Sequence, residues 1–188
     1  MVTPFAPSLE WARVYVKVLR EGHEKACREA SRAAGLSGKD YARAYIPGRM
    51  LTIPVEGGAH ALKSRRADPV VSEHGKWRRE HAGALLAIYG RTPYYQHLAP
   101  ELEAVYRASE GMRLEDFNRE TLALLLSWLD PSVMSGDLWI ANAPASAGMP
   151  AIPASARAVR AEFACAADPA LSILDPLFRH GPDASFLF

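Results

Sequence analysis

The apolar side chains near the start of the chain recur every three or four residues, which is the spacing of one helix face. The pattern runs over residues 9–34, and Gly35 is a natural stop for a helix. Ser8 stands just before the pattern and can accept a hydrogen bond from the first helical turn. Gly22 can divide the stretch into two helices. The apolar positions that set the spacing are Trp11, Tyr15, Val18 and Leu19.

Two apolar runs flank a turn dipeptide in the next part of the chain. Residues 41–46 and 50–55 lie on either side of Pro47-Gly48, and a proline–glycine pair between such runs predicts a β-hairpin. Pro54 lacks the N–H group that a central strand needs, so the second run should form an edge strand or the end of a strand. We therefore expect a small β-sheet here.

Three further helices are predicted in the middle of the chain, after a polar and mixed stretch at residues 59–75. The first covers about 75–89, the second about 100–109, and the third 114–129. Pro100 suits the first position of a helix, because the N–H that proline lacks has no partner there in any case. The apolar face of the third helix should pack in the core or form a dimer seam, and it consists of Leu122, Leu125, Leu126 and Leu129.

The composition shifts to alanine, proline and serine at residues 141–167. We expect a flexible insertion there, with a short helix at about 154–164. The chain as a whole should be a helix-rich α+β fold, with α/β as the alternative, and its small β-sheet should lie around residues 40–56. A length of 188 residues fits a single domain over residues 1–188.

Charge and cysteine content exclude several functional classes. The chain carries 22 basic and 21 acidic side chains, for a formal net charge of +1, so nothing global favours nucleic acid as a partner. Cys27 and Cys165 are far apart and neither lies in a CxxC motif, which is typical of a reducing compartment and not of a disulfide framework or a thiolate metal site. We assign no metal and no cofactor.

The first residues lack a basic segment followed by a clean apolar stretch, and no run of about 18 or more apolar residues occurs. We therefore expect a cytoplasmic protein with no stable membrane insertion.

His81 is the first candidate for chemistry. It shares a helix face with Trp77 and Leu85, which lie four residues before and after it. An imidazole on such a face can act as a general base near neutral pH. It can equally be a half-buried histidine that bonds to the backbone.

Asp175 is the second candidate, because it is the one acid in an apolar run at residues 171–178. Burying an unpaired carboxylate is expensive, so this acid needs a partner or a role. It stands directly before Pro176, and proline favours the first helical position, so Asp175 can be the N-cap of a short helix. It can also orient a histidine or bind an amine.

Several motifs occur together in a fixed order. The longest reads W-x3-H-x7-Y-x3-P-Y-Y over residues 77–95. The string LTIPV at 51–55 precedes it, LSILD at 171–175 follows it, and FAPSLEW stands near the start at 5–11. Their order and spacing resemble the WbqC-like protein family over nearly the whole chain.

The resemblance implies a role in the synthesis of a surface polysaccharide of the O-antigen type. For some members of the family, transfer of glycine or a similar amino-acyl group to a sugar has been suggested, with a nucleotide-linked sugar as one substrate. On that basis His81 would take a proton and Asp175 would orient or cap. The residues that would bind substrate are Arg43, Trp77, Tyr89 and Tyr94.

The chain departs from the family pattern in two places. The His-Gln-Pro triplet with which many relatives begin is absent, and the asparagine of an Asn-Arg pair is replaced in Ala42-Arg43. A non-catalytic binding or assembly protein of the same pathway is therefore the alternative function. A homodimer is compatible with either.

Overall fold

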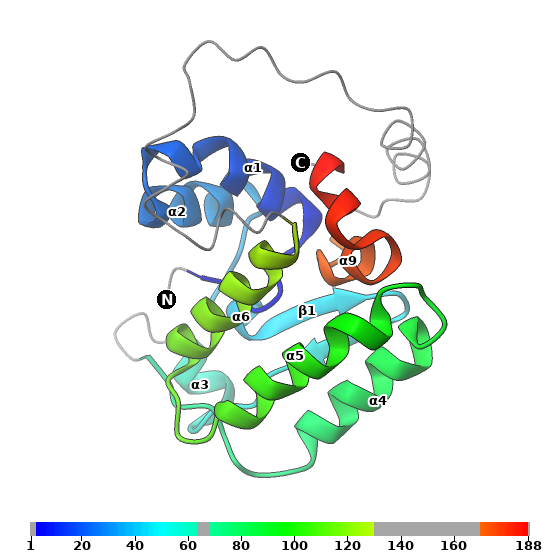
Figure 1. Ribbon diagram of the computed structural model, residues 1–188. Helices are drawn as coiled ribbons and strands as arrows, with labels where there is room; N and C mark the ends of the chain where they lie inside the picture. Colours follow the sequence, from blue (N-terminus) through cyan, green and yellow to red (C-terminus); the bar gives the residue numbers. More distant parts are fainter. Residues whose placement is uncertain (1–2, 64–67, 130–169, 188) are drawn as a thin grey trace.

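The computed structural model describes residues 3–63, 68–129 and 170–187 (Figure 1). These residues form seven α-helices and one two-stranded sheet, which confirms the helix-rich α+β fold. The expected insertion at 141–167, its short helix and Cys165 lie outside the described residues. The helices are α1 (Leu9–Val18), α2 (His23–Ala33), α3 (Gly58–Lys63), α4 (Trp77–Tyr89), α5 (Tyr95–Ala108), α6 (Leu114–Leu129) and α9 (Leu174–His180).

The start of the chain folds as its sequence pattern predicts. The Ser8 hydroxyl accepts a hydrogen bond from the Trp11 N–H at 3.3 Å and so caps α1. A 3₁₀ turn, Leu19–Glu21, and then Gly22 separate α1 from α2. Gly22 has φ of +111°, a conformation that residues with a Cβ rarely adopt. This glycine divides one apolar pattern into two packed helices.

The predicted hairpin is present as strands β1 (Arg43–Ile46) and β2 (Arg49–Thr52), joined by Pro47 and Gly48. Gly48 has φ of +69°, which a two-residue turn of this kind needs from glycine. The strands pair antiparallel, with Arg43 opposite Thr52 and Tyr45 opposite Met50. Side chains alternate between the faces of the sheet, and the inner face carries Ala44, Ile46 and Leu51, all buried.

One expectation about the middle of the chain was wrong. Helix α5 begins at Tyr95, so Pro100 lies inside it and not at its start. The turn that follows α4 sets this start, because the Tyr94 carbonyl already accepts N–H groups from His97 and Leu98. Helix α3, at the start of the polar and mixed stretch, is an element for which no prediction was made.

The segment that precedes α9 joins three distant parts of the fold. Leu171 accepts a hydrogen bond from the Leu9 N–H at 2.9 Å, and the Ile173 N–H donates to Pro7 at 2.9 Å. Between them, the Ser172 N–H donates to the carbonyl of Tyr45 at 2.7 Å. Residues 171–173 therefore fix the start of α1 against the free edge of β1.

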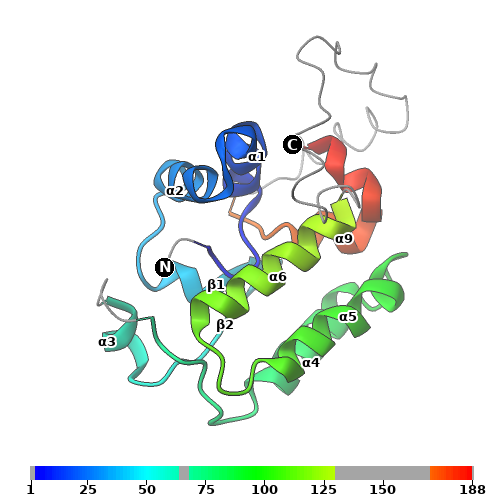
Figure 2. The same ribbon diagram turned by 60° about the vertical axis from the view of Figure 1, so that its left-hand side comes forward.

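The elements lie in layers around helix α6. Figure 2 shows the pair α1 and α2 on one side of α6 and the pair α4 and α5 on the other. The hairpin and α9 fill the space between the two pairs (Figure 1). One continuous apolar core joins all of these elements, and its largest fully buried side chains include Trp11, Tyr15, Tyr89, Phe5, Phe117 and Phe178.

Candidate functional site

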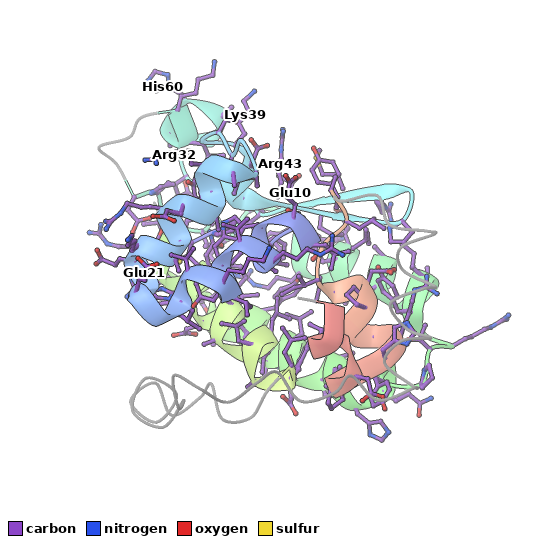
Figure 3. All side chains as sticks on the ribbon, turned by 90° about the horizontal axis from the view of Figure 1, so that it is seen from above. Glu10, Glu21, Arg32, Lys39, Arg43 and His60 are labelled. Atoms are coloured by element: carbon purple, nitrogen blue, oxygen red, sulfur yellow. The ribbon has the colours of Figure 1, made fainter. Side chains whose placement is uncertain are left out.

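A cavity of about 310 Å³ opens where α1, the end of α2 and β1 meet. Arg43 and Tyr45 reach it from β1, Glu10 from the first turn of α1, and Asp40 from the loop between α2 and β1. Figure 3 shows Glu10 and Arg43 next to each other at this border of the molecule. Four polar side chains from three separate segments thus converge on one opening.

Arg43 is the distinctive group of this cavity. It is half-buried, and among the described residues no carboxylate lies within ion-pair distance of its guanidinium. A guanidinium presents several donors in one plane and suits carboxylates and phosphates. Arg43 therefore has the donors for an anionic ligand in a partly enclosed place.

The charged groups around Arg43 differ in whether they already have hydrogen-bond partners. Asp40 is occupied, because its carboxylate accepts hydrogen bonds from the N–H and the hydroxyl of Ser37, at 2.8 and 2.6 Å. Glu10 is exposed and belongs to the cavity lining. Figure 3 places Arg32 and Lys39 on the same side of the molecule as Arg43. The lining thus carries one guanidinium, that of Arg43, and two carboxylates, of which Asp40 already has hydrogen-bond partners.

His81 lies in a different environment, in the core. It is buried between aromatic rings, with ring centroids 5.3 Å from Trp77, 5.7 Å from Tyr106 and 6.2 Å from Phe5. Its Nε2 accepts a hydrogen bond from the Thr52 N–H at 3.2 Å. The Ile53 N–H bonds to Ala42, so the Thr52 N–H points away from β1, and His81 satisfies the outer edge of β2.

Burial lowers the pKa of His81 to about 4. The imidazole is therefore neutral near pH 7, and because Nε2 accepts, the proton resides on Nδ1. Nδ1 is itself buried and has no hydrogen-bond partner within the described part of the chain. The Nε2 lone pair, the only one with which the neutral ring can accept a proton or a hydrogen bond, is therefore engaged by the Thr52 N–H.

Asp175 is not the N-cap of the last helix, as the sequence had suggested. Helix α9 begins at Leu174, one residue before it, and the Ser172 hydroxyl accepts the Leu174 N–H at 3.2 Å. Asp175 is buried, and both of its oxygens lie 3.2 Å from the Nε of Arg179. The neighbouring Asp175 also contributes to a raised pKa of the Tyr89 hydroxyl, although burial is the larger cause.

The three aromatic residues expected to bind substrate have structural contacts. Trp77 is buried and its indole N–H donates to the Ser72 carbonyl at 3.0 Å. Tyr89 is fully buried, with its ring centroid 5.0 Å from that of Phe178. Tyr94 is half-buried beside Gly181, where a Cβ on the glycine would come within 2.4 Å of the tyrosine ring.

The structure does not bring the predicted residues together at one place. Arg43 stands opposite Thr52 in the hairpin, and His81 binds the backbone of the same Thr52. Asp175 instead lies beside Tyr89, which is eight residues after His81 on α4, or about 12 Å along the helix axis. Arg43 opens to the cavity, whereas His81 and Asp175 are enclosed by their own partners.

Comparison with known proteins bears on the same part of the chain. The profile of the WbqC-like protein family matches residues 43–135. The chain belongs to this family. No curated protein and no solved structure matches the chain.

The region matched to the WbqC-like family begins at Arg43 and includes Trp77, His81, Tyr89 and Tyr94. The motifs at residues 5–11 and 171–175 lie outside it, so Glu10 and Asp175 do not share in the match. The cavity therefore combines three residues of the matched WbqC-like segment, Arg43, Ala44 and Tyr45, with residues that precede the segment.

Two cavity residues of this WbqC-like protein escaped the sequence analysis. Tyr45 is two positions after Arg43, and in a strand such residues lie on the same face, so the alternating pattern was a usable signal. Glu10 offered a weaker signal, because only the tertiary contact between α1 and β1 carries it to the cavity.

A cysteine–histidine pair was also missed. His23 and Cys27 are four residues apart, hence on one face of α2, and the ring nitrogens of His23 lie 3.7 and 3.9 Å from the Cys27 sulfur. The Tyr15 hydroxyl lies 2.9 Å from His23 Nδ1. Burial raises the pKa of the Cys27 thiol to about 11, so the sulfur is protonated and poorly nucleophilic.

Within the described residues there is neither a cluster of metal-binding side chains nor a helix that could span a membrane. No set of three or more histidine, cysteine, aspartate or glutamate side chains in them is placed to hold a metal ion. Likewise, the described helices are too short or too polar to cross a bilayer.

Proposed function

We propose that this WbqC-like protein acts in the cytoplasm in the synthesis of a surface polysaccharide of the O-antigen type. Its substrate is a nucleotide-linked sugar or a similar small anionic molecule, bound in the cavity around Arg43. The observation that carries the proposal is the Arg43 guanidinium, which lines that cavity with no ion pair to any described residue. The pathway is the role that resemblance to the WbqC-like family implies, and family membership supports it.

The reaction that we propose is transfer of an amino-acyl group, glycine-like in size, to the sugar. The sugar amine or hydroxyl attacks the carbonyl carbon of an activated amino-acyl donor. A new C–N or C–O bond forms, the bond from the carbonyl carbon to the leaving group breaks, and the attacking group gives its proton to a base. His81 is the base inherited from the family pattern, and Glu10 is the carboxylate that stands in the cavity.

A second candidate function is binding or assembly without catalysis. The placement of His81 favours it, because the ring is buried and its Nε2 is engaged with Thr52. To act as a base, the ring would first have to give up that hydrogen bond. The pairing of Asp175 with Arg179 favours it as well.

Binding is tested with the purified full chain and a nucleotide-linked sugar, by calorimetric titration of wild type and Arg43→Met. Loss of a charged hydrogen-bond donor should weaken binding about tenfold or more. Arg49→Met is the matched control, since Arg49 is an exposed arginine of the same hairpin outside the cavity lining. Equal affinity of wild type and Arg43→Met would overturn the proposal.

Catalysis is tested by product formation from amino-acyl donors, comparing wild type, His81→Gln and Glu10→Gln. Glutamine at position 81 keeps an oxygen that can accept the Thr52 N–H, so the fold has a substitute for the lost bond. If only His81→Gln fails to form product, His81 is the general base. If only Glu10→Gln fails, the general base is Glu10 in the cavity. Binding without product in wild type leaves the non-catalytic function.

A further inference from the structure

The outer face of the hairpin carries two exposed large apolar side chains beside the cavity. Tyr45 is 44% exposed and Met50 is 42% exposed, whereas Ala44, Ile46 and Leu51 on the inner face are buried. The two side chains come from residues directly opposite each other in the register. They form a patch, the Tyr45–Met50 platform.

The platform is held firmly by the backbone. The Tyr45 carbonyl points away from β2 and accepts the Ser172 N–H at 2.7 Å. Tyr45 and Met50 are therefore opposite residues that make no backbone hydrogen bond to each other, and the side chains of such pairs approach closely. The Tyr45 backbone is thus bonded to Ser172, while its neighbours Ala44 and Ile46 pair with β2. A rigid aromatic side chain gives contact area at a small cost in conformational entropy.

The platform continues into the cavity. Tyr45 lines it together with Arg43 and Glu10, and Arg43 and Tyr45 project from the same strand face about 7 Å apart. An aromatic face, a guanidinium and a carboxylate are therefore presented side by side. The aromatic face suits a flat apolar surface, the guanidinium suits an anion, and the carboxylate suits hydroxyl or amine donors.

We propose that the Tyr45–Met50 platform carries the apolar face of a pyranose ring whose phosphate is bound by Arg43 and whose hydroxyls donate to Glu10. This deepens the proposed function, on which it rests, by naming the bound part of the substrate as a sugar phosphate. Tyr45 and Met50 are then residues that determine specificity for the sugar.

The size of the cavity agrees with a small ligand. At about 310 Å³ it lies at the lower end of the range for ligand pockets, about 300 to 1,000 Å³. A sugar phosphate fits this range better than a complete nucleotide-linked sugar, whose nucleoside would extend onto the open surface. Tyr94, which was expected to bind substrate, packs against Gly181 instead.

The experiment is a set of titrations of the full chain with inorganic phosphate, glucose 1-phosphate, UDP and UDP-glucose. Tyr45→Ala should weaken glucose 1-phosphate about threefold to tenfold, from the usual worth of an aromatic contact, and leave phosphate unchanged. Tyr45→Phe should retain the affinity, because the ring is kept. Leu86→Ala removes an exposed apolar side chain elsewhere, 59% exposed, and is the matched control.

The outcomes separate the two proposals. If phosphate and glucose 1-phosphate bind equally, with Arg43→Met weakening both and Tyr45→Ala neither, the platform is overturned and the anion site stands. If UDP binds as tightly as UDP-glucose and Tyr45→Ala weakens it, a nucleobase occupies the platform, and the sugar assignment is overturned. If Arg43→Met changes no affinity, the proposed function fails. Circular dichroism of each variant confirms that it folds.

Discussion

His81 and Arg43 lie at the same hairpin, yet they are available for different tasks. The imidazole of His81 is enclosed by rings and bonded to the Thr52 backbone, whereas the guanidinium of Arg43, opposite Thr52 in the register, opens to a cavity. One ionisable group completes the fold and the other remains free for a ligand. We infer that a partner within the described residues, more than the residue type, decides whether such a group is available to a ligand.

The largest expected effect concerns His81→Ala, which should lower the free energy of unfolding by about 3 kcal/mol. The change leaves a hole among aromatic rings and leaves the Thr52 N–H without its acceptor. Urea denaturation of both proteins measures the effect. A loss below about 1 kcal/mol would mean that the histidine is not a structural element, and the contrast with Arg43 would disappear.

The pH dependence of stability should follow the same histidine. The pKa of His81 is lowered to about 4 in the folded chain, from an ordinary value of 6.5, so the unfolded chain binds the proton more readily. The stabilising contribution is therefore complete above pH 6.5 and is lost as the pH falls from 6.5 to 4, by about 3 kcal/mol. Denaturation at several pH values tests this, and His81→Gln should show a shallower decline. Parallel curves would contradict it.

A smaller effect is expected for the pair that occupies Asp175. The Arg179 side chain is 44% exposed and Asp175 only 6%, so solvent weakens the attraction and their coupling should be about 1 kcal/mol. A double-mutant cycle with Asp175→Asn and Arg179→Met measures it. A coupling energy of zero would show that the ion pair with Arg179 does not stabilise the fold, and Asp175 would again be a candidate for catalysis.

The smallest effect on stability is expected for Arg43→Met, within about 0.5 kcal/mol of wild type. No ion pair with a described residue is lost, and the methionine keeps part of the aliphatic stem. Thermal unfolding without ligand provides the measurement. A cost comparable to that of His81→Ala would show that Arg43 also serves the fold.

Local signals in the sequence predicted those elements that local physics decides. Ser8 as a cap, Gly22 as a break and Gly48 in the turn each act through the backbone of their own neighbourhood. The alternation of side chains along β1 also predicts that Arg43 and Tyr45 share one face of the strand, although Tyr45 was not among the predicted site residues.

Tertiary contacts decided what the sequence left open. Asp175 looked like a cap because Pro176 follows it, but the hydroxyl of Ser172 binds the first turn of α9 instead. Pro100 looked like a helix start, but α5 begins five residues earlier. The helix face alone left His81 open between a general base and a half-buried histidine, and the packing of Phe5 and β2 against it encloses the ring.

The strand-like contacts of residues 171–173 have a consequence for the time course of folding. Ser172 donates its hydroxyl to the carbonyl of Ala6, 166 positions earlier, and its N–H to Tyr45. During synthesis the first helices emerge long before this partner exists, and such distant pairings form slowly. The pocket wall that Tyr45 provides thus acquires its final support only after the chain as far as Ser172 has left the ribosome.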